Sequence, residues 1–107
     1  MNIAITARGY KAPAHLQKYI TDKLKRIDRF SDKVMDLDVI LSYEKLDQVV
    51  EVKAKLRRKV IVVKERSEDV FKSVDLAIDN LERQIAKETK KEKEHDNRKI
   101  VENLVTS

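Results

Sequence analysis

Cysteine is absent from this chain of 107 residues, which excludes disulfide bonds, thiolate metal sites and a cysteine nucleophile. The single glycine lies outside any phosphate-binding loop pattern, and no serine-centred nucleophile motif is present. One proline and one glycine also leave no flexible linker that could separate two domains. These absences remove the usual sequence signs of an enzyme, and we expect a protein with no enzymatic activity and no cofactor.

Aromatic residues are scarce as well: three tyrosines, two phenylalanines and no tryptophan. The sequence therefore shows no stacking platform of the kind that binds single-stranded nucleic acid. The longest strongly apolar run is Val60 to Val63, too short to cross a membrane, and the N-terminus does not resemble a signal peptide. We expect a cytoplasmic protein that has no membrane partner and no small-molecule substrate.

Charge is abundant. Charged residues make up 40% of the chain and hydrophobic residues 41%, so the chain can build one modest core beneath a highly charged surface. Twenty-four lysines and arginines against nineteen acids leave a net charge of +5. This excess favours an anionic partner without identifying one.

Two segments have apolar side chains spaced by three and four residues, which predicts amphipathic helices. The first runs from about Ala12 to Phe30, and the second follows Ser67, which is expected to cap it. The predicted buried stripes are Leu16, Ile20, Leu24, Ile27 and Phe30 in the first, and Val70, Val74, Ile78, Leu81 and Ile85 in the second.

Alternation of apolar and polar residues predicts four strands, at residues 3–6, 36–44, 50–57 and 60–63. The turn at residues 57–59 lacks the glycine or asparagine that tight hairpins prefer, so a looser loop is expected there.

The order of these elements is β-α-β-β-β-α, and it predicts an α+β fold. Both helices must bury their stripes, so we expect a two-layer sandwich with both helices on one face of a four-stranded sheet. Residues 1–95 would form this domain, and residues 96–107 either a flexible tail or a weak docking helix. The expected core contains Ile3, Ile5, Ile20, Leu24, Val39, Leu41, Val52, Leu56, Ile78 and Leu81.

Basic side chains form two ridges opposite the apolar stripes, and these favour binding to a phosphate backbone over simple solvation. The first ridge, on the first predicted helix, contains Lys11, Lys18, Lys25 and Arg29, and Lys23 and Arg26 lie on its flanks. The second ridge, on the last predicted helix, contains Arg83, Lys87 and Lys90. A third basic cluster contains Lys53, Lys55, Arg57, Arg58 and Lys59.

Possible catalytic or metal-binding side chains have simpler explanations. His15 and His95 have no plausible partner nearby in the sequence and are best interpreted as surface residues. Asp36 and Asp38 share one strand face, but alternation alone puts polar groups there. We expect no catalytic residue and no metal site.

The run SEDVFKSVDLAIDNLERQI, from Ser67 to Ile85, resembles the E-D-M-Y-x-A-I-D-x-x-x-x-K-L-E-R-Q-L signature of the ribosome hibernation-promoting factors, also called ribosome-associated inhibitors. The similarity extends to MNIAITARG at the start and to KLKRIDRF in the first helix. The resemblance covers residues 1–93. Long members of the family carry a further C-terminal dimerisation domain, so the chain corresponds either to a short form of the family or to one domain of a longer protein. In place of Met-Tyr the chain has Val70-Phe71, and a basic turn replaces a glycine-containing one.

The resemblance implies a stress factor that occupies the decoding region of the small ribosomal subunit, contacts ribosomal RNA and inhibits translation. By matching position it implies RNA-binding roles for Lys23, Arg26, Arg83, Lys87 and Lys90, and the face argument adds Lys18, Lys25 and Arg29. Two alternatives stay open: a double-stranded-RNA-binding domain, and a protein-interaction module that uses the sheet face or the apolar residues of the tail.

Overall fold

The elements of the fold follow the predicted order. The computed structural model describes the backbone of residues 1–106 and the side chains of residues 1–91. The elements are β1 (Asn2–Ala7), α1 (Ala14–Leu24), a 3-10 helix η1 (Lys25–Phe30), β2 (Val34–Glu44), β3 (Asp47–Leu56), β4 (Val60–Ser67) and α2 (Val70–Thr106).

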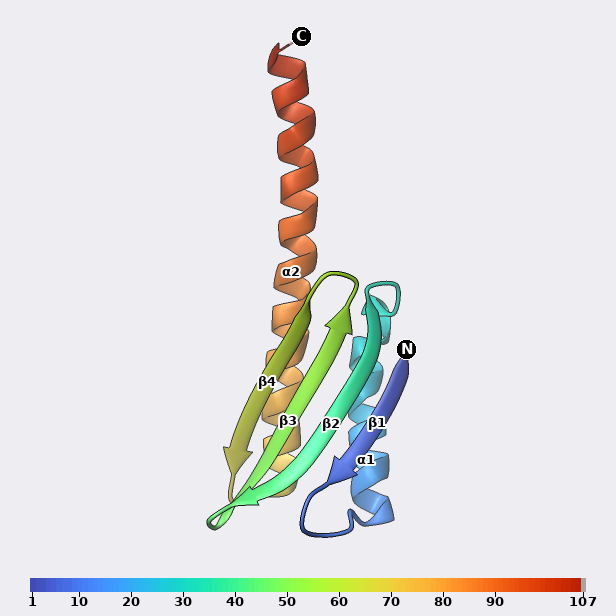
Figure 1. The fold of residues 1–107 in the computed structure, drawn as a ribbon, viewed down its shortest axis with the longest axis vertical. Helices are drawn as coiled ribbons and strands as arrows, with labels where there is room; N and C mark the ends of the chain where they lie inside the picture. Colours follow the sequence, from blue (N-terminus) through green and yellow to red (C-terminus); the bar gives the residue numbers. More distant parts are fainter. Residues whose placement is uncertain (107) are drawn as a thin grey trace.

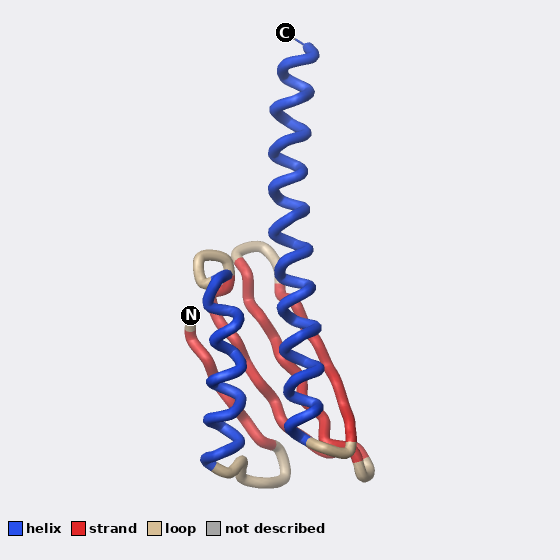
Figure 2. The backbone as a smooth tube through the Cα atoms, turned by 180° about the vertical axis from the view of Figure 1, so that it is seen from behind, coloured by secondary structure: helices blue, strands red, loops and turns tan. Residues whose placement is uncertain are grey.

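The four strands form one sheet in the order β1-β2-β3-β4. β1 is parallel to β2, whereas β3 is antiparallel to both β2 and β4. Figure 1 shows the sheet with α1 and α2 behind it, and Figure 2 shows from the other side that both helices cover the same face. The predicted two-layer α+β sandwich is therefore confirmed.

Strand register places one apolar side chain of each strand in a single row beneath the helices. Ile5 pairs with Val39, Val39 with Val52, and Val52 with Val63. The three valines are at most 2% exposed. Burial of a valine-sized side chain contributes about 1.5–3 kcal/mol to the free energy of folding. This buried row therefore stabilises the packing of the sheet against the helices.

Most of the expected core residues are buried, and the exceptions are the two on β1, Ile3 and Ile5. Its side chain is 39% exposed, and that of Ile5 is only partly buried against the core. β1 is an edge strand with a neighbour on one side only, so its inward side chains are covered less completely. The remaining expected core residues, all buried, are Ile20, Leu24, Val39, Leu41, Val52, Leu56, Ile78 and Leu81.

Helix α1 begins directly after Pro13, whose extended backbone (φ −61°, ψ 153°) ends the preceding loop and whose carbonyl accepts the first helical hydrogen bonds. The predicted single helix to Phe30 is instead divided, because the last six residues form η1. Leu24, Ile27 and Phe30 are spaced by three, which matches the three residues per turn of a 3-10 helix.

The start of α2 differs from the prediction in its cap. Asp69, not Ser67, accepts a hydrogen bond from the backbone N–H of Phe71, at 2.9 Å. Ser67 accepts one from the N–H of Asp69 at 3.2 Å and contacts the hydroxyl of Ser73 at 2.8 Å. The fully buried Ser73 also donates to the carbonyl of Gln48 at 2.8 Å, which fixes the first turn of α2 to β3.

Both hairpin turns are short. In the β3–β4 turn, the N–H of Leu56 donates to the carbonyl of Lys59 at 2.8 Å, so only Arg57 and Arg58 lie between the paired residues. The looser loop expected there is wrong. In the β2–β3 turn, Lys45 adopts a left-handed backbone conformation, with φ +58°, that costs a non-glycine residue roughly 1–2 kcal/mol.

Helix α2 runs well beyond the end of the sheet (Figure 1), which makes the molecule 62 Å long and 24 Å wide. The tail expected at residues 96–107 falls where no side chains are described, so its separate character stays a prediction. Within the described part of the chain, no helix combines the length and the apolar character needed to cross a membrane.

Candidate nucleic-acid interface

The outer surface of α2 carries three of the predicted RNA-binding residues. The buried side of this helix, which includes Leu81 and Ile85, faces the sheet. Arg83, Lys87 and Lys90 lie about half a turn away from it, and all three are exposed. We call these three residues the α2 ridge.

The side chains of the α2 ridge have no ion-pair partner among the residues that the structure describes. From Arg83 to Lys90 the helix rises about 10 Å, so the charges follow a line rather than converge on a point. Spaced, unneutralised cations of this kind suit contact with successive phosphates of a nucleic-acid backbone.

Arg26 lies differently. Its guanidinium donates to Asp79 at 2.7 Å and to Glu82 at 3.1 Å, and both acids belong to α2. These hydrogen bonds, that of Glu82 first, raise the pKa of Arg26. Arg29 approaches the same Glu82 at 4.0 Å. Two predicted RNA-binding residues of η1 therefore lie against carboxylates of the neighbouring helix.

Lys23 has the same kind of partner one turn earlier. Its ammonium lies 3.3 Å from Asp75 of α2, and this carboxylate also accepts a 2.6 Å hydrogen bond from the hydroxyl of Tyr19. That hydrogen bond is the main cause that raises the pKa of Tyr19 to about 12. Lys23, Arg26 and Arg29 thus pair with acids of α2 along the contact between the helices. We call the three acids, Asp75, Asp79 and Glu82, the acidic seam.

Lys18 and Lys25 complete the predicted set, and both are exposed on α1 and η1. Lys25 makes a 3.5 Å contact with Asp22 within its own segment, the kind of exposed pair that is worth little. Lys18 has no charged partner among the described residues. The structure thus divides the eight predicted residues into free cations and cations held by acids.

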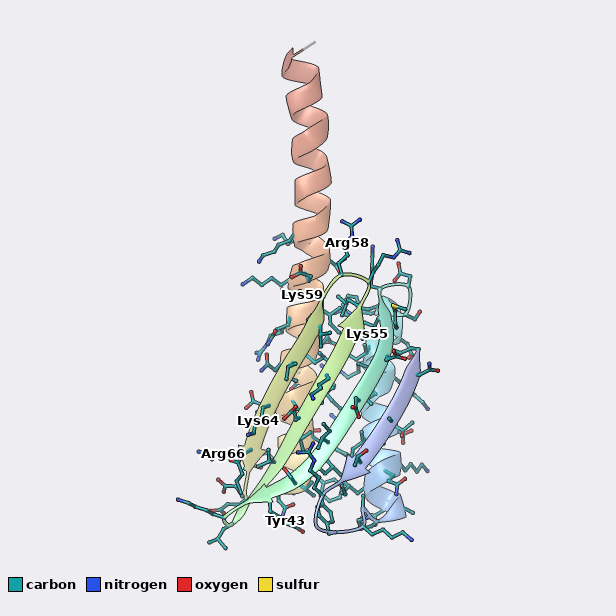
Figure 3. The ribbon with its side chains drawn as sticks, in the orientation of Figure 1. Tyr43, Lys55, Arg58, Lys59, Lys64 and Arg66 are labelled. Carbon is teal, nitrogen blue, oxygen red and sulfur yellow. The ribbon has the colours of Figure 1, made fainter. Side chains whose placement is uncertain are left out.

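The third basic cluster surrounds the β3–β4 turn. Figure 3 shows Lys55, Arg58 and Lys59 at the end of the sheet near α2. Lys59 binds Glu88 of α2 at 3.1 Å, which brings the turn alongside the α2 ridge. Within the described part of the chain, Lys55, Arg57 and Arg58 have no ion-pair partner.

Lys64 and Arg66 are two further cations that the sequence did not single out. They lie on β4 (Figure 3), and both bind Glu44 of β2, at 2.8 and 3.2 Å. The hydrogen bond from Lys64 is the main cause that lowers the pKa of Glu44. This carboxylate offsets their charge, so the basic character of the β4 strand is weaker than its residue types indicate.

The acidic partners on α2 were also missed, although a signal exists. Asp75, Asp79 and Glu82 follow one another by four and three residues, which places them on one side of a helix. Which neighbour that side faces depends on how the two helices pack, and spacing alone does not contain this information. Among the described residues, no group of three or more histidines or acids could hold a metal ion.

Comparison with known proteins identifies relatives of this chain. The chain is 29% identical over 92 residues to the ribosome hibernation promoting factor of Pseudomonas putida, covering 86% of this chain and 90% of that one. To the factor of the same name from Escherichia coli K12 it is 24% identical over 95 residues, 89% of this chain and all of that one.

Two solved structures are similar in fold. One is a ribosomal subunit interface protein from Coxiella burnetii, with a TM-score of 0.78 and 30% identity over 83% of this chain and 98% of that one. The other is the N-terminal domain of Protein Y from Thermus thermophilus, with a TM-score of 0.72 and 29% identity over 79% of this chain and 96% of that one. Residues 3–93 match the family described as sigma 54 modulation protein / S30EA ribosomal protein. The chain belongs to this family of ribosome-associated, non-enzymatic hibernation factors.

Proposed function

We propose that this protein binds the small ribosomal subunit through ribosomal RNA, occupies the decoding region and inhibits translation under stress. The names of its relatives support a role in ribosome hibernation. Bound there, it would work in the cytoplasm and would obstruct messenger and transfer RNA.

The observation that carries the proposal is the α2 ridge, whose three cations are exposed and have no acidic partner among the described residues. A cation without a partner can bind phosphate without first breaking an ion pair. The β3–β4 turn adds Arg57 and Arg58 beside it, because Lys59 fixes the turn to α2. We assign the main RNA contact to the α2 ridge and this turn.

The cations that pair with the acidic seam have a different role in this proposal. Lys23 and Arg26 already have carboxylate partners, so each must exchange a carboxylate for a phosphate before it contributes to RNA binding. Until then they connect α1 and η1 to α2. Lys18 and Lys25 extend the basic surface on α1 and η1, at a greater distance from the core of the contact.

Chemical probing of ribosomal RNA in purified small subunits tests the site directly. With the protein bound, nucleotides of the decoding region should be protected, and added messenger RNA with initiator transfer RNA should compete. Protection confined to other regions of the subunit would contradict the proposed location.

The salt dependence of binding tests the chemistry. Each phosphate contact should contribute about −0.7 to −0.9 to the slope of log affinity against log salt concentration. Co-sedimentation between 50 and 200 mM salt should therefore show a steep loss of binding. An affinity that stays constant over this range would exclude a contact dominated by phosphate.

A further inference from the structure

A pocket of about 460 Å³ opens between the N-terminal ends of α1 and α2. Figure 1 shows both helices starting at the same end of the sheet, far from the projecting end of α2. The volume falls within the range of about 300–1,000 Å³ that is typical of small-ligand sites. The aromatic residues that line it are Tyr10, His15, Tyr43 and Phe71.

These rings already form pairs. The centroids of Tyr10 and Tyr43 lie 4.9 Å apart with the planes tilted by 53°, and those of His15 and Phe71 lie 6.1 Å apart in a stacked arrangement. The side chain of Tyr43 remains 50% exposed, at the end of the sheet (Figure 3). A flat ligand can therefore stack on this ring without displacing a core side chain.

The charges around the pocket indicate which flat ligand fits. Lys11 lines the pocket and has no acidic partner among the described residues. The N-terminal ends of two helices add partial positive charge. Asp69 also lines the pocket, but its carboxylate accepts a hydrogen bond from the backbone N–H of Phe71. The carboxylate of Glu68 is therefore the acid that remains available to a ligand. A nucleotide can use both remaining groups, because its phosphate pairs with Lys11 and the N–H donors of its base reach the carboxylate of Glu68, whereas a cationic side chain would leave Lys11 without a partner.

We propose that this pocket takes one unpaired nucleobase of an RNA strand, stacked on Tyr43, with Lys11 at the adjoining phosphate. The inference rests on the proposed RNA-binding function and adds a second mode of contact, because the α2 ridge can contact only phosphates. Stacking of a base on an aromatic ring is largely independent of sequence. A free carboxylate at Glu68 can in addition accept hydrogen bonds from a base that carries N–H donors.

Titration of the full chain with two RNA probes tests the proposal. The first probe is a tetranucleotide of adenosine, and the second is the abasic tetramer with the same number of phosphates. In titrations followed by NMR, the adenosine tetranucleotide should bind roughly tenfold more tightly than the abasic tetramer. It should also shift the ring signals of Tyr43 and His15. Equal affinity for the two probes would overturn the proposal.

Two variants of one residue separate stacking from fold effects. Tyr43→Phe keeps the ring and should keep the preference for the probe with bases, whereas Tyr43→Ala should abolish the preference without changing the affinity for the abasic probe. Both variants should melt close to the unchanged protein, since the ring is half exposed. A preference that survives in a folded Tyr43→Ala protein would contradict the pocket as the base site.

A third titration excludes the other kind of occupant. If an arginine-containing peptide shifts the Tyr43 signals and the tetranucleotide does not, the pocket recognises a cationic protein segment and the proposal is wrong. The phosphate contact is tested separately, because the abasic probe should lose affinity when Arg83, Lys87 and Lys90 are reversed. Loss of base preference alone would leave the proposed function intact.

Discussion

The guanidinium of Arg26 lies 2.7 Å from the carboxylate of Asp79, 53 positions later in the chain. This contact joins η1 to α2 and occupies the donors with which Arg26 would bind phosphate. An exposed cation of this chain can therefore stabilise the fold and also be available to the binding surface. The balance between these two uses can be shifted by substitution.

Neutral replacement of the partner acids should release the held cations. In the double variant Asp79→Asn with Glu82→Gln, the carboxylates that hold Arg26 and Arg29 lose their charge. We expect affinity for small subunits to rise by roughly three- to tenfold at low salt, because more cations face the RNA. The melting temperature should fall slightly, since the link between η1 and α2 weakens. Co-sedimentation and thermal unfolding measure the two effects.

The matched control removes the same charge from the sheet. Glu44→Gln with Asp47→Asn frees Lys64 and Arg66 on β4 instead. An equal gain in affinity from this pair would assign the effect to net charge and not to the acidic seam. A double variant at Asp79 and Glu82 that melts earlier but binds as before would show that these ion pairs serve only the fold.

Reversal of the α2 ridge should abolish binding. In the triple variant Arg83→Glu, Lys87→Glu and Lys90→Glu, repulsion replaces attraction beside the phosphates, so the protein should no longer co-sediment with small subunits. These side chains are exposed and have no described ion-pair partner. The melting temperature should therefore change little.

The control for the triple variant keeps the charge. Arg83→Lys with Lys87→Arg and Lys90→Arg should bind nearly as well as the unchanged protein, and Lys45→Glu in the distant β2–β3 turn should have a mild effect. Normal co-sedimentation of a folded triple reversal would show that the ridge is only solvated.

The hydrogen bond between Tyr19 and Asp75 should make stability depend on alkaline pH. The pKa of Tyr19 is about 12 in the folded protein against 10.0 for the free side chain, so the folded state holds this proton more tightly. Its contribution is complete below pH 10 and disappears as the pH rises toward 12. Urea unfolding at pH 8, 10 and 11.5 should show a decline that is smaller in Tyr19→Phe.

This comparison separates Tyr19 from the other groups that titrate. Burial raises the pKa of Tyr10 as well, but this effect is common to both proteins. If the free energies of unfolding of the two proteins decline in parallel above pH 10, the hydrogen bond to Asp75 does not persist in solution.

The core row of α2 can be tested with two residues of one helix. Ile78 is 1% exposed and Leu76 is 38% exposed. Ile78→Ala should lower the free energy of unfolding by about 2–5 kcal/mol, because it removes buried methyl groups and leaves a cavity. Leu76→Ala should cost far less, and similar losses from both would mean that the buried stripe is misplaced. Urea unfolding measures both.

The sandwich was predictable because each element has its own local pattern. Alternation identified β2 and β3 over most of their length, and the stripe with Ile78 and Leu81 identified the covered face of α2. The division of the first helix left a trace too, since Leu24, Ile27 and Phe30 are spaced by three. Cap and turn details depended on single hydrogen bonds, such as that from Leu56 to Lys59, which residue types alone do not specify.

The site was less predictable, for a geometric reason. On the α2 ridge, position relative to the buried stripe was enough to identify exposed cations. Lys23 and Arg26 have the same residue types, but they face the neighbouring helix, and their role depends on which side chains α2 presents to them. The aromatic pocket was missed because Tyr10, Tyr43 and Phe71 come from three separate segments.

The parallel pairing of β1 with β2 imposes an order on folding during synthesis. Asn2 bonds to Asp36, 34 positions later, so β1 and α1 leave the ribosome before the strand that must hold them exists. β2 and β3, by contrast, are joined by a two-residue turn and can pair as soon as both have emerged. Closing the longer connection costs more chain entropy. β1 is therefore made before β2 but pairs later than β3 does, and a newly made chain must keep Ile5 exposed until the hairpin has formed.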